Sequence, residues 1–248
     1  MNTYRTVRAE IRKLTSTKMP LAFLSVLVVI GVGNAVAVAF GTDMDGSKTF
    51  ISTAADQQSL IAFAANALLV AALFGAMAVA REYGHGTVAL TFLTTPHRAQ
   101  AVLSQLAAVF IGGSLLGLVG AGLSAGSVAA GLIATDYGFM VSSADLAQVL
   151  AASTLAGGAG AVLGAGIGTL VRNTGGAVTG TIVLLLILPP LAVQAVSETA
   201  RWIPTTIANV MSGVESATGI GAAIAAIGMW ALVPAALGLV AVTRRDVV

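Results

Sequence analysis

Hydrophobic positions along the chain gather in long runs that short polar segments separate. We expect six runs to cross a membrane as helices, at about 20–40, 60–80, 99–135, 146–171, 175–196 and 220–242. A helix needs about 20 apolar residues to span a hydrocarbon core about 30 Å thick. The run at 99–135 would reach roughly 54 Å at about 1.5 Å per residue, which is too short for two crossings and a turn. We therefore predict one long helix there.

Residues 1–19 have a different pattern, in which apolar and basic residues alternate at helical spacing. The apolar positions are Tyr4, Val7, Ile11 and Leu14. The basic positions are Arg5, Arg8, Arg12, Lys13 and Lys18. This pattern predicts an interfacial helix that lies on the membrane with its basic face outward. A flank that happens to be helical and only sets the topology is the alternative.

Residues 197–218, between the fifth and sixth runs, are too mixed to cross a membrane and too apolar to lie free in water. Ile203, Ile207, Val210 and Met211 recur there at helical spacing. We therefore expect one or two short external helices that dip into the outer leaflet. The polar, acidic residues 41–59 and 136–145 are expected to form the other external loops.

The distribution of positive charge fixes the orientation of this arrangement. With six crossings, ten of the twelve Lys and Arg residues fall on one side, and only Lys48 and Arg201 fall on the other. Cytoplasmic segments carry the excess of Lys and Arg, so both termini are expected inside the cell. At 57% hydrophobic residues, the chain has too little polar surface for a soluble fold. We predict a single all-α polytopic domain over 1–248 in the plasma membrane.

The segment 81–98, between the second and third runs, concentrates charged and turn-forming residues. Gly84 and Gly86 allow the backbone to leave a helix, Thr87 can cap a new turn, and Pro96 closes it. This pattern predicts a compact helical element at the membrane surface that docks on a soluble partner. Glu82 and Arg98 suit ion pairs with that partner or with each other.

The order Glu82-x-x-x-Gly86-Thr87, followed by Leu93, Pro96 and Arg98, resembles the cytoplasmic segment of type-2 ABC exporter permeases. These are membrane subunits that pair with a separate ATPase, and the hydropathy layout is similar to theirs over nearly the whole chain. The resemblance implies a coupling helix at 81–98 that seats in a groove of the ATPase. The docking residues would be Arg81, Glu82, Gly86, Thr87, Leu93, Pro96 and Arg98.

The same resemblance implies further partners and a location. A second permease copy or a paralogue would complete a cavity lined by the first, second and fifth crossings, in a bacterial inner membrane. Short helices between the last two crossings are also typical of the family. Because the expected lining is uncharged, we expect an amphipathic or hydrophobic cargo. Membrane lipid is a further partner, and no nucleic acid is expected.

The sequence contains no phosphate-binding loop of the kind that ATP hydrolysis requires. The nearest stretch, residues 41–49, has one residue too many before Lys48 and lies in an external loop. We therefore expect no enzyme activity on this chain, with ATP and Mg²⁺ held by the partner. Every Asp, Glu, Lys and Arg lies at or beyond the end of a run, which argues against an ion-coupled transporter. Asn34 and Asn66 are the polar residues deepest in the runs.

No catalytic, cofactor or metal site is expected either. There is no cysteine, and His85 and His97 lie on the docking segment without a third ligand. Neither histidine lies within a run, so none is placed to activate a serine there. The rival to an exporter is a membrane scaffold, or an immunity or sensor protein, that works without an ATPase.

Small residues and prolines mark several of the predicted crossings. Gly160, Gly164 and Gly168 recur at every fourth position, as Gly113 and Gly117 do in the preceding run. Such spacing lets helices approach closely, either within one subunit or at a seam between two. Pro189, Pro190 and Pro234 bend their helices. They act either as hinges or only as shapers of the packing. The sequence leaves both alternatives open.

Overall fold

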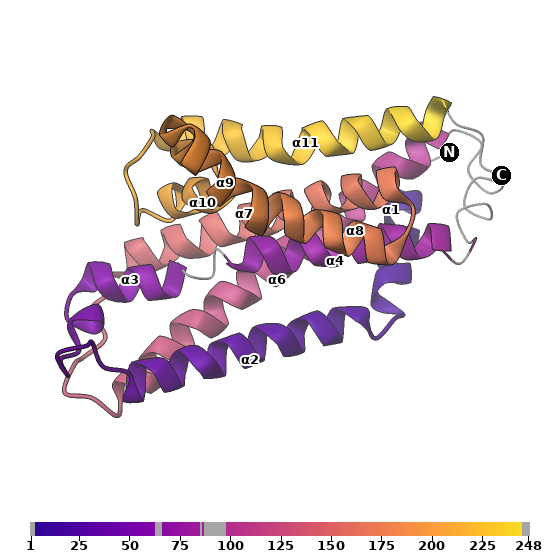
Figure 1. Ribbon diagram of the computed structural model, residues 1–248. Coiled ribbons are helices and arrows are strands. Elements are labelled where there is room, and N and C mark those ends of the chain that lie inside the picture. The colour runs from indigo at the N-terminus through magenta and orange to yellow at the C-terminus, as the bar shows by residue number, and fades with distance from the viewer. Residues whose placement is uncertain (1–2, 63–65, 85, 87–97, 245–248) are drawn as a thin grey trace.

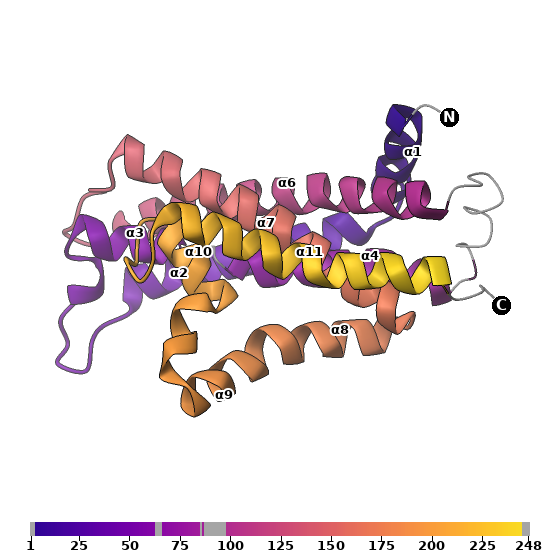
Figure 2. The ribbon, with the colours of Figure 1, turned by 90° about the horizontal axis from the view of Figure 1, so that it is seen from above.

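The computed structural model describes residues 3–62, 66–84, 86 and 98–244 of the chain. These residues form helices and connecting turns, with no strand among them. The long helices run side by side along one axis, and a short N-terminal helix lies across one end (Figures 1 and 2). Five described helices are long and apolar enough to cross a membrane. The all-α class is confirmed, and the helices indicate a multi-pass membrane protein.

The first half of the chain forms six of the labelled elements. They are α1 (Thr3–Thr15), α2 (Met19–Phe40), η1 (Thr49–Ile51), α3 (Ala54–Ala62), α4 (Asn66–Gly84) and α6 (Arg98–Leu132). α1 agrees with the predicted N-terminal helix, and α6 is the single long helix expected in the third run. The second predicted crossing falls on α3 and α4, and residues 63–65 between them lie outside the described part. The second predicted crossing, and with it the total of six, therefore stays a prediction.

α3 begins earlier than the sequence analysis expected, within the segment assigned to the first external loop. Thr53 and Asp56 form a reciprocal cap at its start. The Thr53 hydroxyl accepts a hydrogen bond from the Asp56 N–H at 3.1 Å, and the Asp56 carboxylate accepts one from the Thr53 N–H at 3.0 Å. Two backbone donors that the first turn would leave unpaired are thereby satisfied. The Thr-x-x-Asp pattern was a readable signal for this boundary.

The second half of the chain forms the remaining helices. They are α7 (Ser143–Val171), α8 (Thr174–Ile182), the π-helical turn η3 (Val183–Ile187), α9 (Leu188–Ala195), η4 (Ser197–Trp202), α10 (Pro204–Met211) and α11 (Ile220–Arg244). The tight turn between α7 and α8 was predicted. Arg172 ends α7 in the left-handed region at φ 56°, and the Asn173 side chain accepts from the Gly176 N–H at 2.9 Å. That bond caps α8.

The three glycines Gly160, Gly164 and Gly168 of α7 all face α4. A Cβ atom built on any of them would collide with a backbone carbonyl oxygen of α4. The two backbones therefore approach more closely than any side chain would allow. Because all three glycines are buried within the chain, they favour the packing interpretation and leave no exposed surface there for a subunit seam. On its other side α7 packs in the same way against Gly113 and Gly117 of α6.

Two of the long apolar segments contain the prolines for which bends were predicted. The π-helical turn Val183–Ile187 directly precedes Pro189 and Pro190. A wider turn there accommodates the prolines, which cannot donate to the helical ladder. Pro234 lies inside α11, where its backbone would meet any Cβ added to Gly166 of α7. Pro234 therefore shapes the contact between α11 and α7, and a hinge role stays a prediction.

The segment 197–218 contains the short helices η4 and α10, as predicted, and the apolar side of α10 packs against the long helices. Ile207, Val210 and Met211 are buried in a core cluster that includes residues of α7 and α11. The indole N–H of Trp230 on α11 donates to the Trp202 carbonyl oxygen at 2.9 Å. These apolar residues therefore pack on protein, and the expectation that the segment dips into the outer leaflet stays a prediction.

α2 is the least covered of the five long helices, with 17% of its most apolar window buried. A polar contact near its middle attaches it to α6. The Asn34 amide nitrogen lies 3.3 Å from the hydroxyl oxygens of both Ser124 and Ser127. Asn34, one of the two deepest polar residues in the sequence, thus has a structural partner.

Charge divides the bundle into two unlike ends, whose elements can be followed in Figure 1. The basic end is where α1, the end of α4, the start of α6, the α7–α8 turn and the end of α11 meet. Nine of the eleven described Lys and Arg residues belong there, namely Arg5, Arg8, Arg12, Lys13, Lys18, Arg81, Arg98, Arg172 and Arg244. The opposite, acidic end has seven carboxylates, at Asp43, Asp45, Asp56, Asp136, Asp145, Glu198 and Glu215.

Candidate functional site

Three elements meet at the basic end on either side of the predicted docking segment. α4 enters that segment at Gly84, α6 leaves it at Arg98, and α1 crosses the bundle beside both helices (Figures 1 and 2). α1 is attached to α6 through the hydroxyl groups of Thr6 and Ser104, which lie 2.8 Å apart. The site is thus assembled from parts of the chain that are distant in sequence.

A cluster of three charges joins α1 to the last turn of α4. The Lys13 ammonium nitrogen lies 2.7 Å from a carboxylate oxygen of Glu10 and 2.9 Å from one of Glu82. Glu10 is 8% exposed, and the Glu82 side chain is 19% exposed. Lys13 therefore bridges α1 and the start of the predicted docking segment. The expected pairing of Glu82 with Arg98 or with a soluble partner stays a prediction, because the Arg98 side chain lies outside the described residues.

The surroundings of Lys13 and Glu10 alter how both groups titrate. Burial raises the pKa of the Glu10 carboxyl, and the hydrogen bond and charge of Lys13 offset this only in part. Burial acts to lower the pKa of Lys13, but its hydrogen bonds to Glu10 and Glu82 and their charges prevail, so the Lys13 pKa is raised. Lys13 consequently stays a cation well above neutral pH, and the bridge persists there.

Further contacts hold the last turn of α4 against the rest of the basic end. An Arg81 guanidinium nitrogen lies 3.7 Å from the Met19 sulfur at the start of α2. The Arg172 guanidinium lies over the Tyr83 ring, 5.4 Å from its centre. Such a cation–π contact is worth about 0.5–1 kcal/mol when exposed and more when desolvated. Residues 81–83 thus contact α1, α2 and the α7–α8 turn together.

The structure describes part of the predicted docking segment. α4 ends at Gly84 as expected, and Gly86 lies in the left-handed region at φ 68°, which glycine adopts at no steric cost. The Gly86 N–H donates to the Tyr83 carbonyl oxygen at 3.2 Å. Arg98 begins α6. The other predicted docking residues, Thr87, Leu93 and Pro96, lie outside the described residues, as do His85 and His97.

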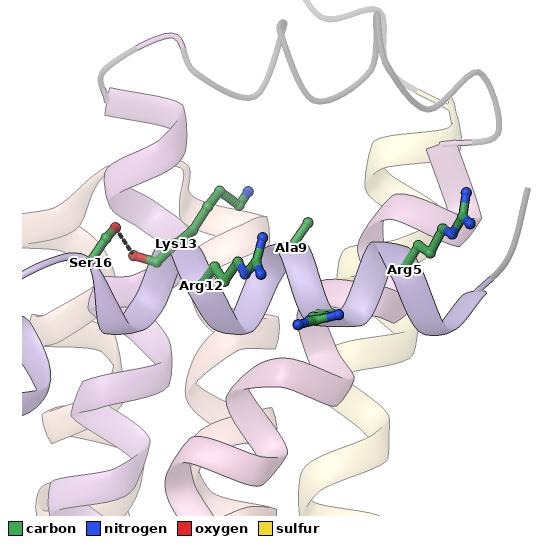
Figure 3. A pocket seen from close by; sticks show the side chains of 6 residues that line it. Arg5, Ala9, Arg12, Lys13 and Ser16 are labelled. Carbon is green, nitrogen blue, oxygen red and sulfur yellow. Dashed lines mark hydrogen bonds between the residues drawn. The ribbon is translucent and has the colours of Figure 1, made fainter.

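Two open hollows lie beside this cluster. One, of about 370 Å³, lies between α1, α2 and α4 and is lined in part by Met19, Ala78 and Arg81. The other, of about 560 Å³, runs along α1, and Figure 3 shows the side chains that line it. Its described lining is Arg5, Arg8, Ala9, Arg12, Lys13 and Ser16. Sequence reasoning placed these cations on one helix face but did not predict the concave surface.

The chemistry of the basic end is dominated by cationic side chains. Across residues 3–62, 66–84, 86 and 98–244 no three His, Asp or Glu side chains are grouped to hold a metal ion. No protein-family model matches the chain, and no curated protein matches it significantly. Function is therefore inferred from the charge, contacts and connectivity of the basic end, together with the short sequence motif at 82–98.

Proposed function

We propose that the chain is the membrane subunit of an ATP-driven exporter of the type-2 ABC class, energised by a separate ATPase that docks on residues 81–98. The observation that carries the proposal is the position of this segment. It leaves the bundle from the end of α4 and returns at the start of α6, at the end where cations gather and where Lys13 bridges to Glu82.

The charge division supports the proposed topology of six crossings with both termini in the cytoplasm. Segments rich in Lys and Arg stay inside the cell, so the basic end is the cytoplasmic end. α3 lies at the acidic end and α4 ends at the basic end, so the chain passes between the two ends over 54–84 (Figure 1). With the other five long helices, this passage makes six, and the docking segment faces the cytosol.

The contacts of α4 give such a segment a mechanical role. The last turn of α4 is joined to α1 through Lys13, and its middle packs backbone to backbone on α7. When the ATPase closes on nucleotide, displacement of 81–98 would move α4 and α7 together, because close-packed helices do not deform independently. ATP and Mg²⁺ reside on the ATPase, and this chain converts its movement into a change of the transport path.

Uncovered apolar surface supports an amphipathic or hydrophobic cargo and a second membrane subunit. α2 has 17% of its most apolar window buried, and the Thr174–Ala195 crossing has 22%. These helices correspond to the first and fifth crossings, which the family resemblance assigns to a shared cavity. Transport assays on the purified complex should show such a cargo. A small inorganic ion as the sole cargo would overturn this part of the proposal.

The topology can be tested first, because the chain has no cysteine of its own. Lys48→Cys and His97→Cys give one thiol each, predicted to be external and cytosolic. A membrane-impermeant maleimide should label the Lys48→Cys variant on intact cells. It should label the His97→Cys variant only after permeabilisation. Labelling of position 97 on intact cells would contradict the proposal that residues 81–98 dock on a cytosolic ATPase.

The docking step is tested by co-purification with a candidate ATPase subunit co-expressed with this chain. Glu82→Ala together with Gly86→Leu should reduce ATPase retention, because it removes a boundary charge and a left-handed glycine. Glu198→Ala at the acidic end is the matched control. Its side chain is 77% exposed, and the substitution should leave retention unchanged. Full retention by the docking variant, or function with no ATPase at all, would favour the scaffold or sensor alternative.

A further inference from the structure

Three arginines on one side of α1 are exposed and have no acidic partner among the described residues. Arg5, Arg8 and Arg12 follow one another at intervals of three and four, which places them along one face of the helix. The described ion pairs of α1 belong to Lys13, which Glu10 and Glu82 neutralise. The face of α1 therefore presents three uncompensated guanidinium groups.

α1 lies at the end of the bundle where, in the proposed topology, the long helices leave the membrane on the cytoplasmic side. It lies across the long helices and projects beyond the bundle at their basic ends (Figure 2). Its Leu14 packs against the core cluster that includes Met19 and Val79. A helix with this amphipathic pattern lies in the plane of the interface, at the depth of the lipid headgroups.

The arginines also share a concave surface. The hollow of about 560 Å³ along α1 is lined by all three of them, and Figure 3 shows Arg5 and Arg12 extending from the same side of the helix. Guanidinium groups bind phosphate oxygens in a bidentate manner, more specifically than an ammonium group does. A hollow of this kind suits a small anionic group held by several arginines.

We propose that α1 is a binding site for anionic phospholipids of the cytoplasmic leaflet, whose phosphate groups are held by Arg5, Arg8 and Arg12. Charge complementarity and depth argue for this occupant, because basic residues on an interfacial helix attract anionic headgroups. The proposal goes beyond the exporter function and does not depend on it. Through Lys13 the site is also attached to Glu82, so lipid held at α1 stabilises the start of the docking segment in its observed position.

The test is a lipid titration of the delipidated full-length protein in detergent, followed by native mass spectrometry. Phosphatidylglycerol and phosphatidylcholine are the two probes. The variant Arg5→Gln/Arg12→Gln removes two of the three charges. The matched control, Lys48→Gln/Arg201→Gln, removes two charges from the acidic end. Thermal unfolding of each variant checks that the fold is intact, which is expected because Arg5 and Arg12 are exposed.

The wild-type chain should prefer phosphatidylglycerol. Each arginine near an anionic membrane surface contributes about a five-fold change in affinity, so the double α1 variant should lose up to about 25-fold. The control should keep the wild-type preference. Equal binding of the two lipids by the wild type, or equal losses in both variants, would overturn the proposal.

Two further outcomes identify a different occupant and would equally overturn it. If millimolar inorganic phosphate displaces phosphatidylglycerol completely, the site binds free anions. If the α1 variant loses ATPase retention while its lipid preference is unchanged, the arginines bind an acidic protein surface. Because lipid preference is measured without any ATPase, failure of this proposal and failure of the exporter proposal give different results.

Discussion

The two ends of the bundle are built from opposite charges and are held together by different interactions. At the acidic end, side-chain amides bind backbone groups. Gln57 is fully buried and donates to the carbonyl oxygens of Ile51 and Gly138 at 3.1 and 3.0 Å. Its own carbonyl oxygen accepts from the Met140 N–H at 2.9 Å. This one side chain thus joins the segment before α3 to the loop between α6 and α7.

Two more glutamines extend this arrangement. Gln58 donates to the Ser212 carbonyl oxygen at 2.9 Å, and Gln148 donates to that of Met211 at 3.1 Å. At the basic end, by contrast, α1 is attached through the partly exposed Lys13 and a pair of hydroxyl groups. The buried bond between Gln57 and Ile51 is costly to leave unmade, whereas the ion pairs of the partly exposed Lys13 are cheap to exchange. The acidic end is therefore the fixed end, and the basic end is the one whose contacts can be remade.

The largest expected effect is at the acidic end. Gln57→Leu removes one buried bond, to the Ile51 carbonyl oxygen, and two partly buried bonds, to Gly138 and Met140. We expect a loss of about 2–3 kcal/mol in the free energy of unfolding, measured with denaturant in detergent micelles. Gln58→Leu, which removes one partly buried bond, should cost only about 1 kcal/mol. Equal losses in the two variants would contradict the assigned role of Gln57.

A smaller and more local effect is expected at the basic end. Lys13→Met removes the cation that bridges Glu10 and Glu82, and Glu10 is left buried without its partner. Because the Lys13 side chain is 42% exposed, we expect about 1 kcal/mol. Hydrogen exchange should show faster opening of residues 3–15 with little change elsewhere. Arg12→Met, on the same helix but without an ion pair, is the control and should leave exchange unchanged.

The ends should also respond to opposite extremes of pH. The Lys13 pKa is raised from 10.5, so its stabilisation of α1 is complete below that pH and is lost as the pH rises through the folded value. Hydrogen bonds from Thr49 and Ser47 lower the pKa of Asp43 below 3.8. Its contribution to the loop at residues 43–49 is present above that pH and is lost as the pH falls through the folded value.

We therefore expect α1 to open more readily in alkali and residues 43–49 to open more readily in acid. Hydrogen exchange measured across pH checks both. The raised pKa of Glu10 works in the same direction as that of Lys13, because protonation relieves the cost of its burial. Lys13→Met should abolish the alkaline transition of α1 and leave the acid transition of the loop unaltered. Loosening of both ends at the same pH would refute this assignment.

Salt should give the smallest effect. Raising the ionic strength from about 0.15 to 1 M shortens the screening length from about 8 to about 3 Å. Protection of α1 should then fall by a few tenths of a kcal/mol, because the Lys13–Glu82 pair is partly exposed. Residues around Gln57 should be unaffected. A salt response at Gln57 that matched the one at α1 would remove the distinction between the two ends.

The sequence predicts the helices well because local pattern determines them. Apolar runs position α2, α6, α7 and α11, and Arg172 with Asn173 marks the turn that the structure shows. The Lys13–Glu82 pair was not predicted, since its members are 69 residues apart and meet only after α1 packs across the bundle. Gln57 was missed for the same reason. Its partners include a loop 81 residues away.

The contact of Asn34 with Ser124 and Ser127 holds α2, most of whose surface is not covered by the rest of the chain. Each residue advances an α-helix by about 100°, so a slip of α2 by one position would carry that amide out of reach of both hydroxyl groups and into hydrocarbon. The amide thereby sets the rotation of α2 about its own axis. It decides that Val29, Val32 and Val36 form the outward stripe that lipid, or another subunit, meets first.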